Sequence, residues 1–348
     1  MSKTTGIGIL GAQFAGKFHT EMWRVIPNAE VVAVADLSEK AREGYLKEYG
    51  PMKMYEDIDG LLGDPNVEVI DICVPNFLHA PIAIKAMEAG KHVICEKPFA
   101  TTLEDGQKVV DVQKKTGQKY FYAEDWIFAP ALVKAEKLLN EGGIGKPLFF
   151  KGKECHNGSH SPFAKTIKYC GGGSMIHVGI HAIGYFLHLL GMPEKVTGCC
   201  NGGYEDNFVH KDFEGEDWAL AVLHYPGGQK ALVEGNYITT GGMNDIMEVY
   251  GTDGLIRVDL TFGSPLSVFS KQGISYAVEK AEFTQGWTKP AVNEFESLGY
   301  KDELSHFLQC IREDVPQVKS TTAEAGFNVL KIIDAIYRSH REQRTVVL

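Results

Sequence analysis

Short apolar runs alternate with amphipathic stretches over the first 125 residues. Runs rich in Val and Ile without strict alternation are typical of strands covered on both faces, and the stretches between them have the apolar spacing of helices. Strands are expected at residues 7–10, 31–35, 69–74 and 92–95, and helices at 18–25, 39–49 and 80–89. This alternation predicts a parallel sheet built from β-α-β units.

One further helix has both of its ends marked by the sequence. Residues 101–104, Thr-Thr-Leu-Glu, have the spacing of a capping box, in which side chains bond the first free amides of a helix. Gly117 suits the left-handed position that follows a helix. With a last strand expected at 118–123, the first domain is predicted to span residues 1–125.

The hydrophobic period changes toward two after an expected helix at 131–140 and a glycine-rich turn at 141–145. A period of two is typical of half-buried strands, which are expected at 148–154, 195–200, 219–224, 230–237, 246–250 and 256–260. A closing helix is expected to begin at the capping-box spacing of Thr321 and Glu324. Residues 126–348 are therefore predicted to form a second α/β domain around a large, open, mainly antiparallel sheet.

Composition and charge narrow the class of protein. The chain has 348 residues, a formal net charge of -10 and no long basic run, so the charge pattern of a nucleic-acid-binding protein is missing. The seven cysteines lack C-x-x-C spacing, which favours buried thiols in a reducing, cytoplasmic compartment. The start leads directly into a strand pattern and no run of about 18 apolar residues occurs, so neither a secretion signal nor a membrane span is expected.

A glycine-rich turn follows the first strand. It has two of the three glycines of the dinucleotide fingerprint, and such a turn aims backbone amides and a helix N-terminus at a pyrophosphate. The candidate cofactor residues of this turn are Gly11, Gln13, Phe14, Ala15 and Gly16. Asp36 ends the second strand, 20 residues beyond Gly16, where its carboxylate could bond ribose hydroxyls and would repel a 2′-phosphate. A Rossmann domain that binds NAD is predicted, the alternative being a flavodoxin-like fold with an ordinary turn.

Further candidates follow the third and fourth strands, at the edge where open α/β sheets bind ligands. Pro75, Asn76 and His79 come after strand 69–74, where they could contact the cofactor or simply form the turn and cap the next helix. Glu96 and Lys97 follow strand 92–95 and precede Pro98, so their charges are expected to emerge at the same edge.

These motifs give the chain a resemblance to a known family. The sequence resembles, along nearly its whole length, the Gfo/Idh/MocA oxidoreductases, named for glucose-fructose oxidoreductase, inositol dehydrogenase and a rhizopine-catabolism protein. The residues that carry the resemblance are Gly11 to Gly16, Pro75, Asn76, Glu96, Lys97, Pro98, Gly142 to Pro147, Gly171 to Gly173, and His181. It implies an NAD(P)-dependent enzyme acting on CH–OH groups, with a second domain for substrate binding and oligomerisation whose last helix can pack back on the first.

The resemblance also implies catalytic roles. Lys97 would lie beside the nicotinamide and the sugar hydroxyl, where a neighbouring positive charge lowers a lysine's pKa toward a value useful for proton transfer. The alternative is a solvated strand-end lysine paired with Glu96. His181 would hold and deprotonate the hydroxyl. His177 stands where the family usually has aspartate, one helical turn before His181, so both imidazoles are expected to point the same way.

The substrate pocket departs from the family pattern. Glu124, Asp125 and Trp126 replace a stretch that carries Asn and Arg in many relatives, and the two carboxylates are expected to accept hydrogen bonds from sugar hydroxyls. The other substrate candidates are His156, His160, His177 and His181. Together with Glu154, these histidines have the residue types of a zinc or manganese site. Because the resemblance implies catalysis without a metal, hydrogen bonding to the sugar is preferred and no metal is expected.

The sequence thus predicts an NAD-dependent dehydrogenase that oxidises a secondary hydroxyl of a sugar, glycoside or cyclic polyol, for example at position 3 of a glucoside. Lys97 or His181 would take the proton. Two alternatives stay open: a glycoside-cleaving enzyme that recycles tightly held NAD, and a non-catalytic sugar or nucleotide sensor. A homo-oligomer is expected because one subunit does not cover both faces of an open sheet.

Overall fold

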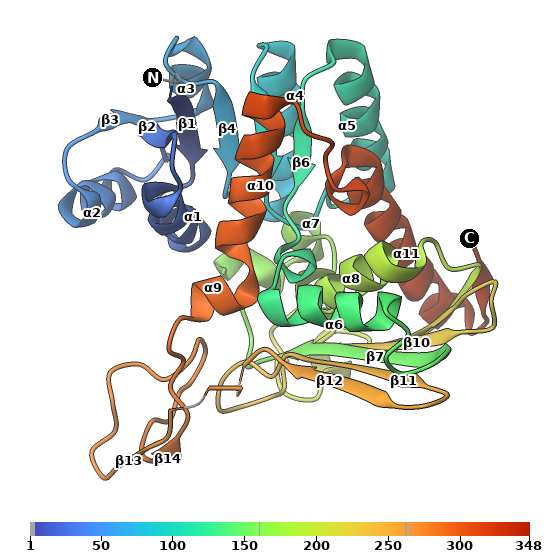
Figure 1. The fold of residues 1–348 in the computed structure, drawn as a ribbon. Helices are drawn as coiled ribbons and strands as arrows, with labels where there is room; N and C mark the ends of the chain where they lie inside the picture. The colour runs from blue at the N-terminus through green and yellow to red at the C-terminus, as the bar shows by residue number, and fades with distance from the viewer. Residues whose placement is uncertain (1–3, 160, 262, 265) are drawn as a thin grey trace. The chain divides into compact units, whose positions relative to one another are not determined.

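The computed structural model describes residues 4–159, 161–261, 263–264 and 266–348 (Figure 1). The chain forms two compact units, and each is built from two separate segments. The first unit comprises Met1–Glu124 and Tyr300–Phe327, and the second comprises Asp125–Gly299 and Asn328–Leu348.

The first unit contains a six-stranded parallel sheet in the order β3-β2-β1-β4-β5-β6. Its strands are β1 (Thr5–Leu10), β2 (Ala29–Ala35), β3 (Lys53–Tyr55), β4 (Val69–Ile72), β5 (His92–Cys95) and β6 (Tyr120–Tyr122). Its helices in the first segment are α1 (Phe14–Val25), α2 (Glu39–Tyr49), α3 (Ile58–Gly63), α4 (His79–Glu88) and α5 (Leu103–Thr116). The predicted Rossmann-type sheet is confirmed, with β3 and α3 as additions.

The strand order reverses between β1 and β4, which are hydrogen-bonded neighbours. Leu10 pairs with Ile72, and Ile72 pairs with Cys95, so β1, β4 and β5 end at the same level. The residues that follow these three strands, Gly11, Cys73 and Glu96, therefore lie together at the carboxyl edge of the sheet, where open α/β folds bind ligands.

The segment Tyr300–Phe327 belongs to the first unit, whereas the sequence analysis placed residues 126–348 in a second domain of which only the last helix could pack back on the first. Helix α10 (Tyr300–Glu313) supplies side chains that this sheet needs for cover: Phe307 stacks on Phe121 of β6 at a centroid distance of 4.7 Å. At the end of the same segment, a Cβ added to Gly326 would lie 2.6 Å from the Phe99 ring, which shows how closely the backbone approaches. Helix α11 (Ala323–Glu342) begins in the first unit and ends in the second.

The second unit contains a seven-stranded mixed sheet in the order β12-β11-β7-β10-β9-β8-β15. Its strands are β7 (Pro147–Cys155), β8 (Lys195–Cys200), β9 (Trp218–His224), β10 (Lys230–Asn236), β11 (Ile246–Gly251), β12 (Leu255–Asp259) and β15 (Val346–Val347). Only β7 and β10 pair in parallel among these neighbours, so the mainly antiparallel sheet is confirmed. Helices α6 (Pro130–Asn140) and α8 (Ile180–Leu190) lie over one face of it (Figure 1).

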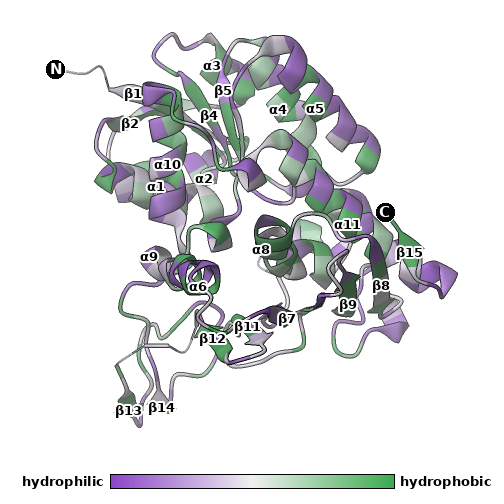
Figure 2. Ribbon diagram, turned by 45° about the vertical axis from the view of Figure 1, so that its right-hand side comes forward, coloured by the Kyte–Doolittle hydropathy of each residue, from purple (hydrophilic) through white to green (hydrophobic). Residues whose placement is uncertain are grey.

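A π-helical turn, Met175–Gly179, leads directly into α8. The stretch Ile167–Leu190 is long and apolar enough to cross a membrane, although no such run of apolar residues was expected from the sequence. It begins with the short helix α7 (Ile167–Cys170). Of its most apolar window, 72% is buried inside the protein, and Figure 2 shows α8 as one of the most hydrophobic helices. Such burial is typical of the core helix of a globular unit.

Two helix N-termini differ from the expected capping boxes by one residue. Thr102, not Thr101, caps α5: its hydroxyl accepts a hydrogen bond from the Asp105 amide at 3.1 Å. Thr322, not Thr321, similarly accepts from the Ala325 amide at the start of α11, at 3.2 Å. Consecutive threonines offer two equivalent caps to a sequence pattern, and only the backbone geometry selects one. The predicted left-handed residue after α5, Gly117, is confirmed with φ of 68°.

Candidate active site

The turn between β1 and α1 fits the phosphates of a dinucleotide. Gly11 has φ of 107°, and a Cβ there would lie 2.2 Å from the Cys73 carbonyl oxygen. A Cβ on Gly16 would lie 1.8 Å from the Gly11 oxygen, so only glycine allows this approach of helix to strand. Gln13 stands at the N-cap of α1 without a side-chain capping bond, and Phe14, 45% exposed, begins the helix. The Gln13 side chain therefore does not compete with an anion for the first amides of α1, of which Ala15 has one.

Asp36 ties the end of β2 to this turn. Its Oδ2 accepts from the Ala12 amide at 2.9 Å and its Oδ1 accepts from the Ser38 amide at 2.8 Å. Each carboxylate oxygen can accept more than one hydrogen bond, so these contacts leave capacity for ribose hydroxyls. The two amides also fix the orientation of the carboxylate beside the glycine turn.

The loop after β4 is held by a buried histidine. Pro75 and Asn76 open a 3-10 turn, Asn76–Leu78, and are half-buried. His79 is 1% exposed, and its Nδ1 and Nε2 lie 2.7 Å and 2.8 Å from the carbonyl oxygens of Pro98 and Val74. Burial lowers the pKa of His79. Its side chain therefore fixes the two loops that follow β4 and β5, so its part in any cofactor site is to shape these loops.

Glu96 and Lys97 follow β5 directly, both half-buried, and the Lys97 amide donates to Glu96 Oε2 at 3.1 Å. Glu96 Oε1 lies 3.0 Å from Nε2 of His19, a fully buried residue of α1. Nδ1 of His19 lies 2.9 Å from both carboxylate oxygens of Asp71 on β4. Burial acts to lower the pKa of His19, but the charge of Asp71, the neighbouring Cys73 and the hydrogen bonds to both together outweigh burial, so the pKa is raised well above the usual value.

This network was not predicted from the sequence. Its members lie 25 to 77 positions apart and meet only because α1 packs on β4 and β5 at one sheet edge. An imidazolium between two carboxylates satisfies all three groups by charge-assisted hydrogen bonds. The contact with His19 thereby fixes the Glu96 side chain, which in turn holds the backbone amide of Lys97.

In the second unit, the side chain of His181 lies between two carboxylates. Its Nδ1 is 2.9 Å from Asp125 Oδ1, and its Nε2 is 3.5 Å from Glu154 Oε2. His181 is on the first turn of α8, Glu154 is on β7, and Asp125 begins the 3-10 turn Asp125–Ile127. All three are at most 5% exposed. The ring of Trp126 stacks on His181 at a centroid distance of 6.0 Å.

Asp245 is a further ionisable residue near Glu154, and it was not predicted from the sequence. Strand β11 runs antiparallel to β7 with Ile246 opposite Lys153, and the Asn244 amide donates to the Cys155 carbonyl at 2.8 Å. This register puts Asp245 opposite Glu154 on the same face of the sheet. Asp245 is 1% exposed, and burial, followed by the charge of Glu154, raises its pKa well above the usual value. No local signal marks it, because its partner is 91 residues away in the chain.

His177, whose imidazole was expected to point the same way as that of His181, contacts a tyrosine of the second unit. His177 Nδ1 makes a short contact with the hydroxyl of Tyr237. The π-helical turn carries His177 and inserts an extra residue before α8, so the spacing of an α-helical turn does not apply. Tyr237 also stacks on His156 at 5.5 Å, so it joins two of the predicted substrate residues.

The remaining predicted substrate residues divide as follows. Glu124, fully buried, ends the first segment of the first unit, and its amide donates to Glu303 Oε1 at 2.6 Å. His160 lies outside the described residues.

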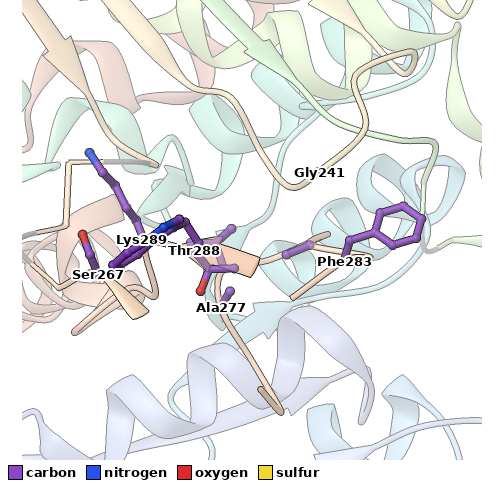
Figure 3. Close-up of a pocket in the computed structure, with 9 residues that line it drawn as sticks. Gly241, Ser267, Ala277, Phe283, Thr288 and Lys289 are labelled. Atoms are coloured by element: carbon purple, nitrogen blue, oxygen red, sulfur yellow. The ribbon is translucent and has the colours of Figure 1, made fainter. Parts of the chain in front are cut away.

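A cavity of about 460 Å³ lies beside the hairpin of β13 (Val268–Ser270) and β14 (Gly286–Thr288) in the second unit (Figure 3). Phe283 and Trp287 line it together with Ala277 and Val278, and Lys289 is its charged residue. None of its nine described lining residues is a carboxylate or a histidine, so the cavity does not contain the imidazole and carboxylate groups that surround His181.

Sequence comparison matches two family profiles to the chain. One, described as an oxidoreductase family with an NAD-binding Rossmann fold, matches residues 5–124. The other, described as the C-terminal alpha/beta domain of that oxidoreductase family, matches residues 136–348.

Relatives of known activity match over their full length. Levoglucosan dehydrogenase of Pseudarthrobacter phenanthrenivorans is 28% identical over 98% of this chain and 97% of its own. An inositol 2-dehydrogenase of Salmonella paratyphi B is 32% identical over 99% and 97%. Among solved structures, GenD2 from gentamicin A biosynthesis in complex with NAD aligns with a TM-score of 0.92 and 22% identity, over 100% of this chain and 97% of that one. At that identity the likeness shows the fold.

Proposed function

Because the two profiles cover most of the chain, the protein belongs to the Gfo/Idh/MocA oxidoreductase family, and we propose that it oxidises a secondary hydroxyl of a sugar, glycoside or cyclic polyol to a ketone with NAD. Full-length relatives named for levoglucosan and inositol support this substrate class. The observation that carries the proposal is that Lys97 directly follows β5, at the same sheet edge as the Gly11 turn.

The first unit supplies the cofactor residues. NAD held by these residues would supply the acceptor for the hydride of the carbinol carbon. The α1 N-terminus and the Gly11 turn would hold the pyrophosphate, and Asp36 would hold the adenine ribose. A 2′-phosphate would meet the Asp36 carboxylate, which is already oriented by the Ala12 and Ser38 amides. This repulsion supports NAD over NADP.

Proton transfer is assigned to Lys97 and His181. A lysine beside a cationic nicotinamide has a lowered pKa and can take the hydroxyl proton as a base. His181, whose Nδ1 lies 2.9 Å from Asp125 Oδ1, would hold the substrate hydroxyl and could take its proton in place of Lys97. Trp126 and His156 would contact the sugar, with His177 held by Tyr237 nearby.

The test is a Lys97→Met variant assayed with a panel of glycosides, free sugars and cyclitols by NADH absorbance. We expect turnover to fall by at least about a hundredfold, the scale of general-base catalysis, while NAD binding measured by calorimetry is retained. Lys115→Met, an exposed lysine of α5, is the matched control. Near-normal turnover of Lys97→Met would overturn the assigned role.

The same assay separates net oxidation from transient oxidation. A dehydrogenase releases one NADH for each ketone formed, whereas a glycoside-cleaving enzyme that recycles its cofactor releases product without NADH accumulation. We expect stoichiometric NADH, and cleavage products without NADH would favour the recycling enzyme.

We also infer a homo-oligomer that assembles through the sheet of the second unit. One face of β7, β9, β10 and β11 carries half-buried side chains, including Phe149, Leu220, Val222 and Leu232, while α6 and α8 lie over the other face. The same face also carries charged residues such as Lys151, Glu234 and Glu248, and a mixed face of half-buried side chains without covering helices can form a subunit interface. The cysteine thiols, five of them buried, support a reducing, cytoplasmic compartment. Small-molecule substrates, rather than nucleic acid or membrane, are the partners that the net charge of -10 favours.

A further inference from the structure

The imidazole of His19 lies between two carboxyl groups at the carboxyl edge of the parallel sheet. His19 and Asp71 are fully buried, and the Glu96 side chain is largely buried. Nδ1 of His19 is 2.9 Å from Asp71 Oδ2, and Nε2 is 3.0 Å from Glu96 Oε1. A neutral imidazole has one donor and one acceptor, whereas a protonated imidazole donates from both nitrogens. The two contacts therefore require a protonated ring, or a proton on one of the carboxyl groups.

The other partners of the two carboxyl groups favour the protonated ring. Asp71 Oδ2 also accepts a hydrogen bond from the indole nitrogen of Trp23 at 2.7 Å. Glu96 Oε2 accepts from the Lys97 amide at 3.1 Å. An ionised carboxylate only accepts hydrogen bonds, so donors on both groups fit two carboxylates with the proton on His19. Burial acts to lower the pKa of His19, but its acidic neighbours raise it well above the usual value, in agreement with this assignment.

Glu96 connects His19 to Lys97. One oxygen of its carboxylate contacts the imidazole, and the other contacts the backbone amide of the lysine that directly follows it. A carboxylate close to a lysine favours the charged, ammonium form of that lysine. By itself, Glu96 would therefore oppose the loss of a proton that a lysine needs before it can act as a base.

The imidazolium of His19 offsets this effect. Its positive charge lies between the negative charges of Asp71 and Glu96, and its Nε2 is 3.0 Å from the Glu96 carboxylate. Charges inside a protein are screened less than charges in water, so a change of one charge in this group acts on the neighbouring lysine. Without the imidazolium, two carboxylates would stabilise the ammonium form of Lys97.

We propose that His19 is a positioning residue for the reaction: its buried imidazolium holds the Glu96 carboxylate and offsets the charge of that carboxylate, which allows Lys97 to act as a base. His19 acts through Glu96, whose second oxygen holds the Lys97 amide. The effect on turnover rests on the proposed function, whereas the protonated state of His19 does not.

Other titratable residues of the first unit also face this group, and two of them are kept uncharged near neutral pH. Burial raises the pKa of the Cys73 thiol to about 12. Burial lowers the pKa of His79, which is influenced by the charges of Glu96 and Lys97. The titratable residues that face His19 or Lys97 from β4, the end of β5, α4 and α10 are Asp71, Cys73, Glu96, His79 and Tyr300, whose ring lies 6.1 Å from that of His19.

The test compares pH profiles of the full-length wild type and His19→Gln, which keeps a polar side chain but carries no charge. At saturating NAD, kcat/KM is measured from about pH 6 to pH 10 with the glycoside or cyclitol of the panel that the wild type oxidises fastest. Because the base acts in its unprotonated form, kcat/KM rises with pH to a plateau. We expect His19→Gln to shift this rise by about one unit to higher pH, which lowers kcat/KM about tenfold below the plateau and leaves the plateau in place.

Glu96→Gln gives the opposite perturbation, because it removes the negative charge and keeps an oxygen that can accept from the Lys97 amide. Its rise should move to lower pH. A second measurement needs no substrate: ¹⁵N NMR of histidine-labelled protein should show both ring nitrogens of His19 protonated at pH 8. The His19 signals are identified by their change in Glu96→Gln.

His92→Gln is the matched control, since His92 is a half-buried histidine at the opposite end of β5, and it should keep the wild-type profile. Circular dichroism checks that each variant is folded, and Glu96→Gln carries the kinetic test if His19→Gln is not. A rise that stays at the same pH with a plateau lowered throughout would show a structural role only, and a neutral His19 ring at pH 8 would refute the imidazolium; either result would overturn the proposal. Near-normal turnover of Lys97→Met would instead refute the proposed base, whatever the NMR shows for His19.

Discussion

Glu216 gives the sharpest prediction of pH-dependent stability. Its Oε1 accepts hydrogen bonds from the Met175 amide and the Tyr337 hydroxyl, both at 2.9 Å, so it holds the start of the π-helical turn. Burial raises the pKa of Glu216 to about 7, against the opposing effect of these hydrogen bonds. The folded protein therefore keeps the proton of this carboxyl over a pH range in which the unfolded chain has lost it.

The sign follows from this difference. A raised pKa in the folded state contributes stability that is fully present below the pKa of the unfolded chain, about 4.3, and is lost as the pH rises through about 7. Between about pH 5 and pH 8, at about 1.36 kcal/mol per pKa unit, the loss amounts to about 2.5 kcal/mol. Glu216→Gln keeps an oxygen acceptor for both donors and removes the ionisation, so this share of the pH dependence should disappear.

The assay is urea unfolding of wild type and Glu216→Gln in parallel at about pH 5 and pH 8, with Glu205→Gln as an exposed control from the same unit. Comparing proteins at each pH cancels the contribution of all other titrating groups. We expect the stability difference between wild type and Glu216→Gln to change by about 2.5 kcal/mol over this range, and that of the control to stay constant. An equal pH dependence of wild type and Glu216→Gln would refute the buried, protonated carboxyl.

Two further predictions concern packing. Gly235→Ala should unfold at lower urea concentration than wild type, because its Cβ would lie 2.8 Å from the Gly179 amide nitrogen. Gly44→Ala in α2, with open space around the added Cβ, should instead gain up to about 1 kcal/mol in free energy of unfolding. Equal effects of the two substitutions would contradict the close contact of β10 with the π-helical turn. His19→Leu should destabilise the first unit by about 3 kcal/mol or more in the same assay, because it leaves Asp71 buried without its ion-pair partner; a neutral effect would show that the imidazole is not charged there.

The parts of the fold that sequence predicts well are those with a local cause. The ends of α2 match the expected residues 39–49, and Gly117 takes the left-handed conformation after α5 as its position suggested. Each of these depends on residues within one or two turns. Even here the local pattern has limits, since Thr101 and Thr102 are chemically equivalent caps.

Features that depend on register or on distant packing could not be predicted. Asp245 joins Glu154 only through the pairing of β11 with β7, and one residue of slip would turn its side chain to the other face. The π-helical turn that carries His177 ahead of His181 has no signature in the spacing of the sequence. Helix α10 was missed although Leu304, Phe307 and Leu308 have helical spacing, a signal that could have revealed it.

The assignment of Tyr300–Phe327 to the first unit has a consequence for how the chain acquires its structure during synthesis. The stack of Phe307 on Phe121 cannot form until about nine-tenths of the polypeptide has left the ribosome. The N-terminal sheet therefore lacks the contacts of α10 while the second unit is being translated. A fragment ending at residue 125 would leave Phe121 and Phe99 open to solvent and to aggregation. To express the first unit by itself, residues 300–327 must therefore be joined to residues 1–124. The order in which the segments are synthesised differs from the order in which the two units can be completed.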